Sequence, residues 1–357
     1  MRTFHCDKCG QQVFFENTRC ENCGGMLGYQ PEHRAISTFE PVEGGLWRSL
    51  NQANEGMLYK QCRNYAEQDV CNWMLGAQEH SELCASCQLT HVIPALTSPK
   101  NHLFWQRLEA AKRRLLYSLW DLQLQPTPKA DDPQQGLAFE FLEDLPNGPR
   151  VLTGHANGVI TLNIAEADPA TRERVREQMH EPYRTLLGHF RHESGHYYFD
   201  RLITGTPWEE KFRALFGDER QDYAESLNRH YEQGPPADWA LNYISAYATM
   251  HPWEDWAETW AHFLHMFDTL DTAFACGMML KPRKPQEPEM AITTPPTRNT
   301  AFDDMLSDWF ALSYVLNSLN RSVGMPDPYP FTLSTPVIDK LRFVHEVVFA
   351  YKQAAVA

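Results

Sequence analysis

His192-Glu193-Ser194-Gly195-His196 has the pattern H-E-x-x-H, and the residues on both sides of it predict a helix. Positions i and i+4 of a helix lie one above the other on the same face. The two imidazoles can therefore bind one Zn²⁺, with Glu193 beside them as general base. The pattern predicts a zinc hydrolase, and a peptidase is the favoured kind. Because the chain has 15 histidines, a helix that carries two of them by chance is the alternative interpretation.

A catalytic zinc ion needs a third protein ligand and one position that stays open for water. Residues 251–265 have a helical pattern, several carboxylates and three tryptophans, so these acids are not expected to be simple surface residues. Glu258 is the favoured ligand, and Glu254 and Asp255 are the alternatives. Glu254 and Glu258 share one helical face. The carboxylate that does not bind the metal could therefore accept the free N–H of a ligating histidine.

Eight of the nine cysteines lie within the first 87 residues, which indicates metal ligands rather than disulfides in a reducing compartment. The first set consists of two C-x-x-C pairs, and each pair presents two thiolates from one tight turn: Cys6, Cys9, Cys20 and Cys23. This spacing predicts a zinc ribbon with a closed, structural Cys₄ site. Two redox dithiols are the alternative. A redox pair would be expected at the start of a helix in a βαβ unit, and neither pair has that context.

The second set has only one close pair, so its spacing is less specific: Cys62, Cys71, Cys84 and Cys87. A second structural Cys₄ site is expected, and four small buried hydrophobic residues are the alternative. His80 and His91 are candidates to replace one of these thiolates. The ninth cysteine, Cys276, lies in an apolar stretch and is expected in a hydrophobic core.

The chain has 32 basic and 46 acidic residues, which give a net charge of -14. An acidic surface repels phosphate backbones, so nucleic acid is not the expected partner and a protein partner is favoured for the zinc ribbon. Lys112, Arg113 and Arg114 are expected on a solvated helix face. No run of residues approaches the length of a membrane span and the N-terminus lacks a signal-peptide core. A cytoplasmic location away from membranes is therefore expected.

The expected fold class is α+β in two parts. Residues 1–95 form a Cys-rich zinc-ribbon region, and residues 96–357 form a mostly helical domain with a small antiparallel sheet. The second part begins with a helical linker at 98–124, and strands are expected at 137–141, 150–153 and 159–164, with a hairpin turn at Asn157-Gly158. A helix from about 242 should end before Pro252, another should run over 253–267, and two more should close the chain. The proline-rich stretch 281–300 is expected to be a surface loop.

Several long motifs extend this interpretation over most of the chain. They are the two cysteine sets, Cys71-Asn72-Trp73, Thr153-Gly154-His155, Ile160 to Asp168, Tyr183 to Tyr198, Phe216 to Arg220, and His251 to His265. With these motifs, residues 4–275 resemble the zinc-binding metallopeptidase family of bacteria that carries an N-terminal zinc-ribbon domain. The resemblance implies a zincin-like catalytic domain and does not imply a known substrate. Phe199 stands where these families usually have Trp, and no ligand is lost.

The resemblance also implies roles for further residues. Ala257-Glu258-Thr259-Trp260-Ala261 is similar to the helix that supplies a glutamate ligand in gluzincin-like enzymes, which supports Glu258. In some such enzymes an upstream Tyr or His polarises the substrate carbonyl. Tyr247 and His251 are the candidates for that catalytic role, with packing or hydrogen bonding to a ligand as the alternative. Zincins hold an extended substrate on an exposed edge strand, and Val159–Ile164 is the expected strand.

The combined prediction is a metallopeptidase that hydrolyses a peptide bond with zinc-activated water and Glu193 as base. It includes one catalytic and two structural Zn²⁺ ions, and a peptide or protein substrate. The alternative is a zinc-ribbon adaptor that binds a protein through an inactive or regulatory metallohydrolase domain. The intact His192, Glu193, His196 and Glu258 argue against this alternative. A zinc hydrolase with a non-peptide substrate also remains open.

Overall fold

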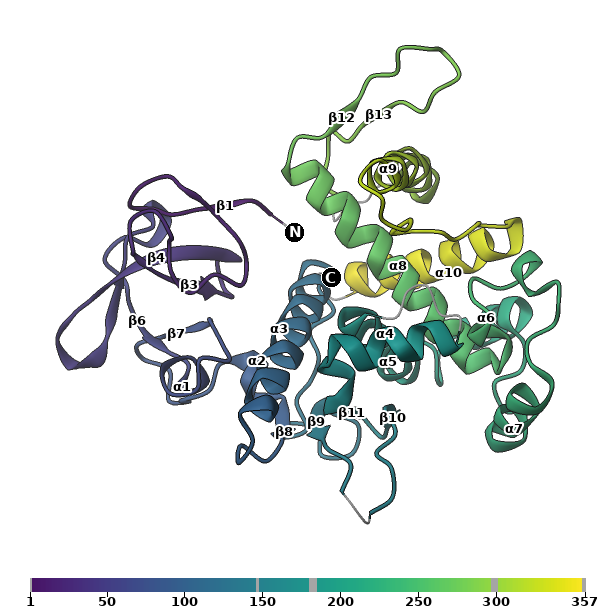
Figure 1. Ribbon diagram of the computed structural model, residues 1–357, viewed down its shortest axis with the longest axis horizontal. Helices are drawn as coiled ribbons and strands as arrows, with labels where there is room; N and C mark the ends of the chain where they lie inside the picture. The colour runs from purple at the N-terminus through teal and green to yellow at the C-terminus, as the bar shows by residue number, and fades with distance from the viewer. Residues whose placement is uncertain (1, 146–147, 180–184, 297–300, 355–357) are drawn as a thin grey trace. The chain divides into compact units, whose positions relative to one another are not determined.

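Figure 1 shows the computed structural model, which describes residues 2–145, 148–179, 185–296 and 301–354. The chain forms two compact units. The first, called the N-terminal unit, comprises Arg2–Tyr117 and Pro126–Asp168. The second, called the helical unit, comprises Ser118–Gln125 and the chain from Pro169 onward. This division differs from a boundary at residue 95, because most of the long helix and the small sheet after it belong to the N-terminal unit. The predicted domain boundary itself stays a prediction.

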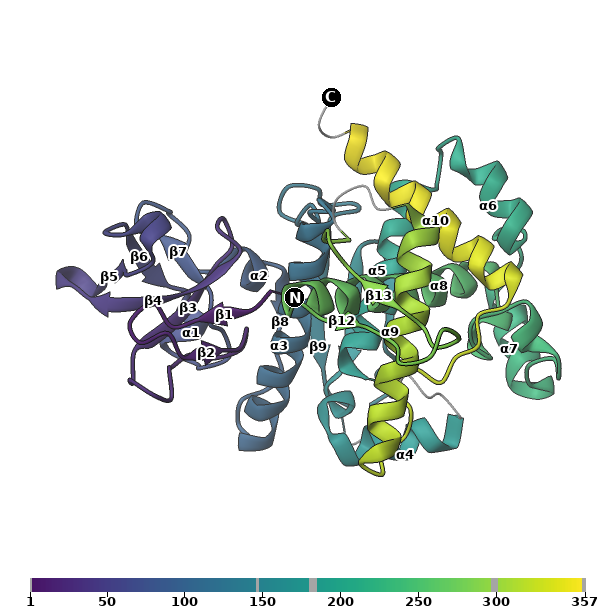
Figure 2. The ribbon, with the colours of Figure 1, turned by 90° about the horizontal axis from the view of Figure 1, so that it is seen from above.

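The N-terminal unit begins with a small hairpin and a five-stranded antiparallel sheet (Figure 2). The hairpin strands are β1 (Phe4–His5) and β2 (Gln12–Val13). The sheet strands, in spatial order, are β3 (Met26–Gln30), β4 (Ala35–Pro41), β5 (Trp47–Ser49), β6 (Leu58–Gln61) and β7 (Met74–Gly76). A bridge between Tyr29 and Trp73 brings the first strand back beside the last, and these two fully buried rings pack with centroids 5.0 Å apart.

A second, four-stranded sheet follows in the same unit. Its strands are β8 (Thr90–Val92), β9 (Ala138–Leu142), β10 (Gly154–Ala156) and β11 (Val159–Asn163), in the order β10-β11-β9-β8. The helices of this unit are the single turns α1 (Arg63–Ala66) and α2 (Ala85–Gln88) and the long α3 (Pro99–Asp121), whose last turn belongs to the helical unit. The Asn157-Gly158 turn joins β10 to β11 with positive φ at both residues, as a two-residue hairpin requires.

Three expectations about this sheet are wrong. The sheet is mixed rather than antiparallel, because β9 pairs in parallel with both β8 and β11. Strand β11 is also no edge strand, since it is paired on both sides. Finally, residues 150–153 form no strand. Their hydrogen bonds go to side chains instead: the Val151 N–H donates to Asp144, and the Asn163 amide donates to the Val151 carbonyl.

The helical unit contains seven α-helices among its described residues besides the end of α3. They are α4 (Pro169–Met179), α5 (Leu186–Leu202), α6 (Trp208–Phe216), α7 (Tyr223–Gln233), α8 (Pro252–Ala275), α9 (Phe302–Ser322) and α10 (Thr335–Ala354). Instead of the helix expected from about 242, two 3-10 turns are found, η4 (Trp239–Leu241) and η5 (Tyr247–Thr249). The expected loop includes β13 (Met290–Ala291), which pairs with β12 (Met279–Leu280), and its last residues, 297–300, lie outside the described residues. No helix of the described chain is both long and apolar enough to cross a membrane.

Helices α5 and α8 pack directly against each other in the centre of this unit. A Cβ on Gly195 would lie 3.0 Å from the Ala257 Cα and 3.1 Å from the Trp260 ring, so a larger residue would crowd this contact. The indole N–H of Trp256 donates to the Gly195 carbonyl at 2.8 Å, and that of Trp260 donates to Ser194 Oγ at 3.1 Å. The two variable positions of H-E-x-x-H therefore fix how the two helices meet.

Two basic residues that were expected on the surface are buried instead. Lys112 and Arg113 do not lie on a solvated face: both are buried in the N-terminal unit, where Lys112 Nζ lies 2.9 Å from Glu109. In the helical unit, the buried Lys340 of α10 donates to Asp255 of α8 at 2.6 Å. A buried charge is stable only with a partner, and each of these has one. Cys276 is exposed rather than in a core, because it lies just after the end of α8.

Candidate active site and zinc centres

The H-E-x-x-H residues lie on α5, as the sequence predicts. The helix begins after Thr185, whose hydroxyl accepts from the Gly188 N–H at 2.9 Å and caps the first turn. His192 and His196 are one turn apart on the face toward α8, with ring centroids 5.0 Å apart. Glu193 lies between them in sequence and is buried. The local geometry thus presents two imidazoles and a carboxylate from one helix.

Glu254, in the first turn of α8, completes a group of three donors with the two histidines. Its Oε2 lies 2.9 Å from His192 Nε2 and 3.4 Å from His196 Nε2. Donors that share a tetrahedral zinc ion at about 2.0–2.1 Å are separated by about 3.3 Å. Two imidazole nitrogens and one carboxylate oxygen at these separations fit the ligand set of a catalytic zinc site.

Glu258, which the sequence favours as the third ligand, does not belong to this group of three donors. Its Oε1 is 2.6 Å from His192 Nδ1, the ring nitrogen on the side opposite to Glu254. This is the position of a carboxylate that accepts the free N–H of a ligating histidine and fixes its tautomer. The donor group thus contains Glu254, whereas Glu258 contacts the other nitrogen of His192, an arrangement opposite to the one the sequence favoured. Asp255, the other alternative, is paired with Lys340.

The electrostatics of the site follow from burial and from these contacts. Burial alone would lower the pKa of His192, but the hydrogen bonds to Glu254 and Glu258 raise it well above its ordinary value. Burial raises the pKa of Glu193, although both histidines partly oppose this. Among the described residues, Glu193 Oε2 has no hydrogen-bond partner. A buried carboxylate with a free oxygen and a raised pKa is suited to accept and return a proton.

The two candidates for polarising a carbonyl have different surroundings. His251 caps α8: its Nδ1 accepts from the Trp253 N–H at 3.1 Å, and its Nε2 lies 3.2 Å from the Gln221 carbonyl oxygen. Both ring nitrogens are therefore engaged in holding the backbone. The Tyr247 ring lies 6.0 Å from that of His192, so its hydroxyl remains a candidate. Burial raises the pKa of Tyr247, which keeps the hydroxyl protonated.

Two further aromatic residues surround the donors, and the sequence predicted a role at the site for neither of them. The Trp253 ring packs on His196 with centroids 3.7 Å apart. The Tyr223 hydroxyl donates to Glu254 Oε1 at 2.9 Å. Tyr223 lies 31 positions before Glu254 and belongs to no recognisable pattern. Only the Asp222 cap, which marks the start of α7, indicates that a helix begins there.

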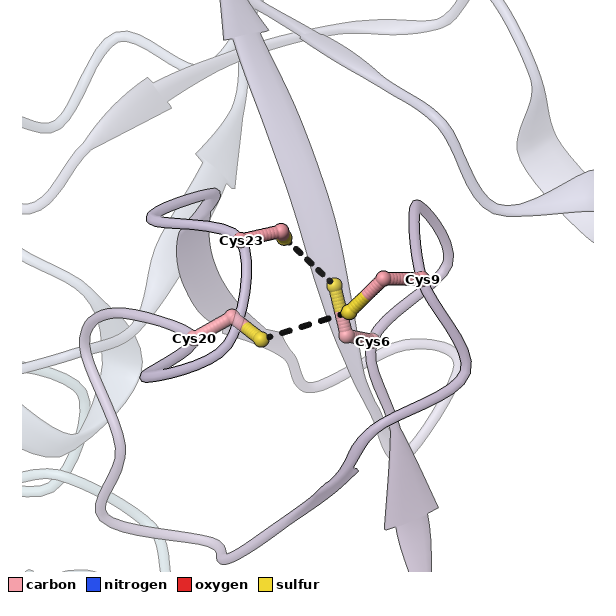
Figure 3. Close-up of side chains that lie close together, drawn as sticks. All are labelled: Cys6, Cys9, Cys20 and Cys23. Carbon is pink, nitrogen blue, oxygen red and sulfur yellow. Dashed lines mark hydrogen bonds between the residues drawn. The ribbon is translucent and has the colours of Figure 1, made fainter.

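The cysteines form two further donor groups in the N-terminal unit. In the first, shown in Figure 3, Cys6 Sγ lies 3.6 Å from Cys23 Sγ, and Cys9 Sγ lies 3.6 Å from Cys20 Sγ. Ligands at about 2.3 Å from a tetrahedral zinc ion are about 3.8 Å apart, so the four thiols fit one ion. A hydrogen bond from the Asn22 side chain and one from the Gln11 backbone lower the pKa of Cys9 to about 6. In the same set, the Gly25 backbone hydrogen bond lowers the pKa of Cys23, but burial and the other three thiols raise it to about 12.

The second group has the same chemistry in a deeper position. All four thiols are buried, and Cys71 Sγ lies 3.7 Å from Cys84 Sγ. Backbone N–H groups point at the sulfurs: that of Trp73 at Cys71 and that of Cys84 at Cys62, each at 3.4 Å. Such donors stabilise thiolates that are bound to a metal. The four cysteines by themselves make up this donor group, without His80 or His91.

The two Cys₄ groups and the mixed architecture define a zinc-binding α+β protein. Comparison with known families identifies which one. Residues 101–347 match the family described as "Putative zinc-binding metallo-peptidase", and residues 3–98 match a zinc-ribbon domain. Since the first match covers more than half of the chain, the protein belongs to this metallopeptidase family, as the sequence motifs indicated.

The relatives found in curated sequences extend over almost the whole chain. Proteins of Mycobacterium bovis and of two strains of Mycobacterium tuberculosis, each named only as uncharacterised, are 42% identical over 350 residues. These matches cover 98% of this chain and 95% of each relative. No solved structure matches significantly.

Proposed function

We propose that this protein is a zinc-dependent peptidase whose metal is held by His192, His196 and Glu254. The observation that carries the proposal is the convergence of these three donors beside Glu193, a buried carboxylate with one free oxygen. Family membership supports zinc as the metal and a peptide as the substrate class. Glu258 is assigned to the Nδ1 side of His192, where it orients the ring.

Bound zinc would supply Lewis-acid polarisation of the scissile carbonyl and acidify a water molecule. The other steps belong to residues of the chain. Glu193 accepts a proton from the attacking water through its free Oε2 and later returns it to the leaving amine. Its raised pKa makes the carboxylate a stronger base toward water and helps the carboxyl to keep the proton until it is returned. Tyr247 remains the candidate donor to the oxyanion.

The two Cys₄ groups are assigned one structural zinc ion each, so that three ions are expected per chain. Four thiolates complete a tetrahedral shell and leave no position for a substrate. The His₂Glu group has only three donors, which is the arrangement of a catalytic site. The difference in donor number is the basis for separating one catalytic ion from two structural ions.

The deciding experiment is the change Glu193→Gln, with the matched control Glu210→Gln on the exposed face of α6. Full-length protein is first tested against an unbiased peptide library, and the best cleaved peptide then serves as substrate. Loss of the general base should lower kcat by about 10²- to 10⁴-fold, because the amide cannot accept a proton. Zinc content should remain at three ions, since Glu193 is not a ligand, and Glu210→Gln should behave like the wild type.

Two outcomes would count against the proposal. Equal peptide turnover in the wild type and in Glu193→Gln would show that the cleavage comes from elsewhere. A zinc-loaded wild-type protein that cleaves no member of the library would favour the adaptor alternative. In that case, the zinc content of the wild type and of His192→Ala is compared. Two zinc ions in both proteins would show that the helical site does not hold the metal.

A further inference from the structure

We infer that Tyr223 is a positioning residue that fixes the Glu254 carboxylate, so that one oxygen of Glu254 faces both histidines and the other is held away from the metal. This inference rests on the proposed function, because it concerns the same three-donor site. It adds a fourth residue, from a helix that carries none of the three donors. It also predicts how the open position of the site is preserved.

The hydrogen bonds of Glu254 divide its two oxygens between two tasks. Oε1 accepts the Tyr223 hydroxyl at 2.9 Å. Oε2 is the atom that lies 2.9 Å from His192 Nε2 and 3.4 Å from His196 Nε2. Glu254 is only 1% exposed, so solvent does not compete for either oxygen. The side chain therefore presents a single oxygen to the metal-binding group.

The Tyr223 side chain is itself held by the first turn of α8. Its ring lies 5.5 Å from the His251 ring and 5.9 Å from the Trp253 ring, in an edge-on arrangement to each. His251 also approaches the carbonyl of Gln221, two residues before Tyr223, through its Nε2 atom. His251 therefore links the start of α7 to the start of α8, and it assists the site by placing Tyr223 beside Glu254.

The start of α7 is fixed locally as well. The Asp222 side chain accepts from the Glu225 N–H at 2.8 Å and caps the helix, which places Tyr223 at its first position. A tyrosine hydroxyl is protonated at neutral pH, so it can act as the donor in this contact. A donor hydroxyl on a capped helix end gives the carboxylate a defined orientation at neutral pH.

The chemical consequence concerns coordination. A carboxylate that has both oxygens free can bind zinc through either one or through both, whereas a catalytic site needs an open position for water. A hydrogen bond to Oε1 lowers the tendency of that oxygen to bind the metal. Without the hydroxyl, the carboxylate is no longer held with Oε2 toward both histidines. Metal affinity should then fall by about 10- to 100-fold, the range typical for residues that orient a ligand.

The test is Tyr223→Phe in the full-length, zinc-loaded protein. Phenylalanine keeps the ring that packs on His251 and Trp253 and removes only the hydroxyl. The control is Tyr231→Phe, two turns further along α7, where the exposed Tyr231 side chain has a ring contact with His230. Release of each zinc ion is followed by competition with a chromogenic chelator. The third, most weakly held zinc should be lost about 10- to 100-fold more readily in Tyr223→Phe.

The other measurements separate positioning from other roles. The melting temperature and the two tightly held zinc ions should match those of the wild type, and Tyr231→Phe should not differ from it. In a Glu254→Gln background, Tyr223→Phe should add little further loss of zinc affinity, because its effect passes through that carboxylate. Unchanged zinc affinity in Tyr223→Phe would overturn the inference. A lower kcat together with unchanged affinity would instead place the hydroxyl on the substrate.

The zinc measurement also keeps this inference separate from the proposed function. A wild-type protein that binds the third zinc but cleaves no peptide would defeat the peptidase proposal. The affinity difference between Tyr223→Phe and Tyr231→Phe would still be measurable in that protein. Conversely, a catalytically active protein with equal zinc affinity in both variants would defeat only the role assigned to Tyr223.

Discussion

The metal-binding groups of the two units differ in donor type and in what surrounds them. Each cysteine group in the N-terminal unit has four thiols, and backbone N–H groups point at several of the sulfurs. The group in the helical unit has three donors of two kinds and lies beside the free oxygen of Glu193. A complete set of like donors favours stability, whereas an incomplete mixed set leaves room for chemistry. Family membership alone does not make this distinction.

The two cysteine groups also differ from each other. In the first, Cys9 is exposed and Cys23 is partly exposed, whereas all four thiols of the second are buried. The second group lies close to the fully buried Trp73, whose backbone N–H contacts Cys71. Removal of a ligand from the second group should therefore disturb the hydrophobic core as well as the metal.

The largest effect is expected from Cys71→Ser. The change removes a ligand from a buried site, and structural zinc contributes about 10–16 kcal/mol of apparent binding free energy in small zinc domains. We expect loss of one zinc ion and cooperative unfolding of the N-terminal unit at a much lower temperature, measured by circular dichroism and limited proteolysis. Cys9→Ser should have a smaller effect, because Cys9 is exposed and its turn lies outside the core.

Cys276→Ser is the matched control for both changes, since Cys276 is exposed and belongs to no donor group among the described residues. It should leave zinc content and melting temperature unchanged. Equal destabilisation by Cys71→Ser and Cys9→Ser would remove the distinction between the two cysteine groups. It would imply that the zinc ion, and not the surrounding core, determines the stability of both.

A smaller effect, confined to the third zinc, should separate Glu254 from Glu258. If Glu254 is a ligand, Glu254→Gln should weaken the third zinc by more than about 100-fold. Glu258→Gln should weaken it by only about 10- to 100-fold, because Glu258 acts through His192. Both cysteine sites should keep their zinc ions in both variants. The measurement is zinc release to a chelator at fixed pH, and the reverse order of the two effects would restore Glu258 as the ligand.

The success and failure of the sequence predictions have a common physical origin. Local spacing determines which side chains share a helical face, so H-E-x-x-H and the C-x-x-C pairs could be placed on their elements in advance. The choice between Glu254 and Glu258 depends on the rotation of α8 relative to α5, which no spacing within α8 specifies. That rotation is set by contacts between the two helices, such as that of Gly195 with Ala257 and Trp260, which join distant segments.

The contribution of Tyr223 was out of reach for the same reason. Its hydroxyl reaches Glu254 from another helix, and His251 contacts the residues before that helix. The burial of Lys112 was missed for a related reason. A run of three basic residues is usually solvated, but Lys112 pairs with Glu109, one turn earlier on α3, and donates to the distant Thr90 of β8. Long-range partners, rather than the residue types themselves, decide both cases.

The smallest effect tests the packing that places the helical site. Gly195→Ala adds a methyl group where 3.0–3.2 Å separates the new Cβ from backbone and indole atoms, so α5 and α8 must move apart. Overpacking of this kind costs about 1–3 kcal/mol, measurable as a lower free energy of unfolding in urea. Gly154→Ala is the control, because a Cβ there meets no atom within 4 Å and φ is not positive. Its effect should be within about 0.5 kcal/mol.

Since a shift of α5 against α8 separates Glu254 from both histidines, Gly195→Ala should also weaken the third zinc while both cysteine groups keep theirs. Lower stability with unchanged affinity for the third zinc would show that the helix contact supports the fold and does not set the geometry of the site.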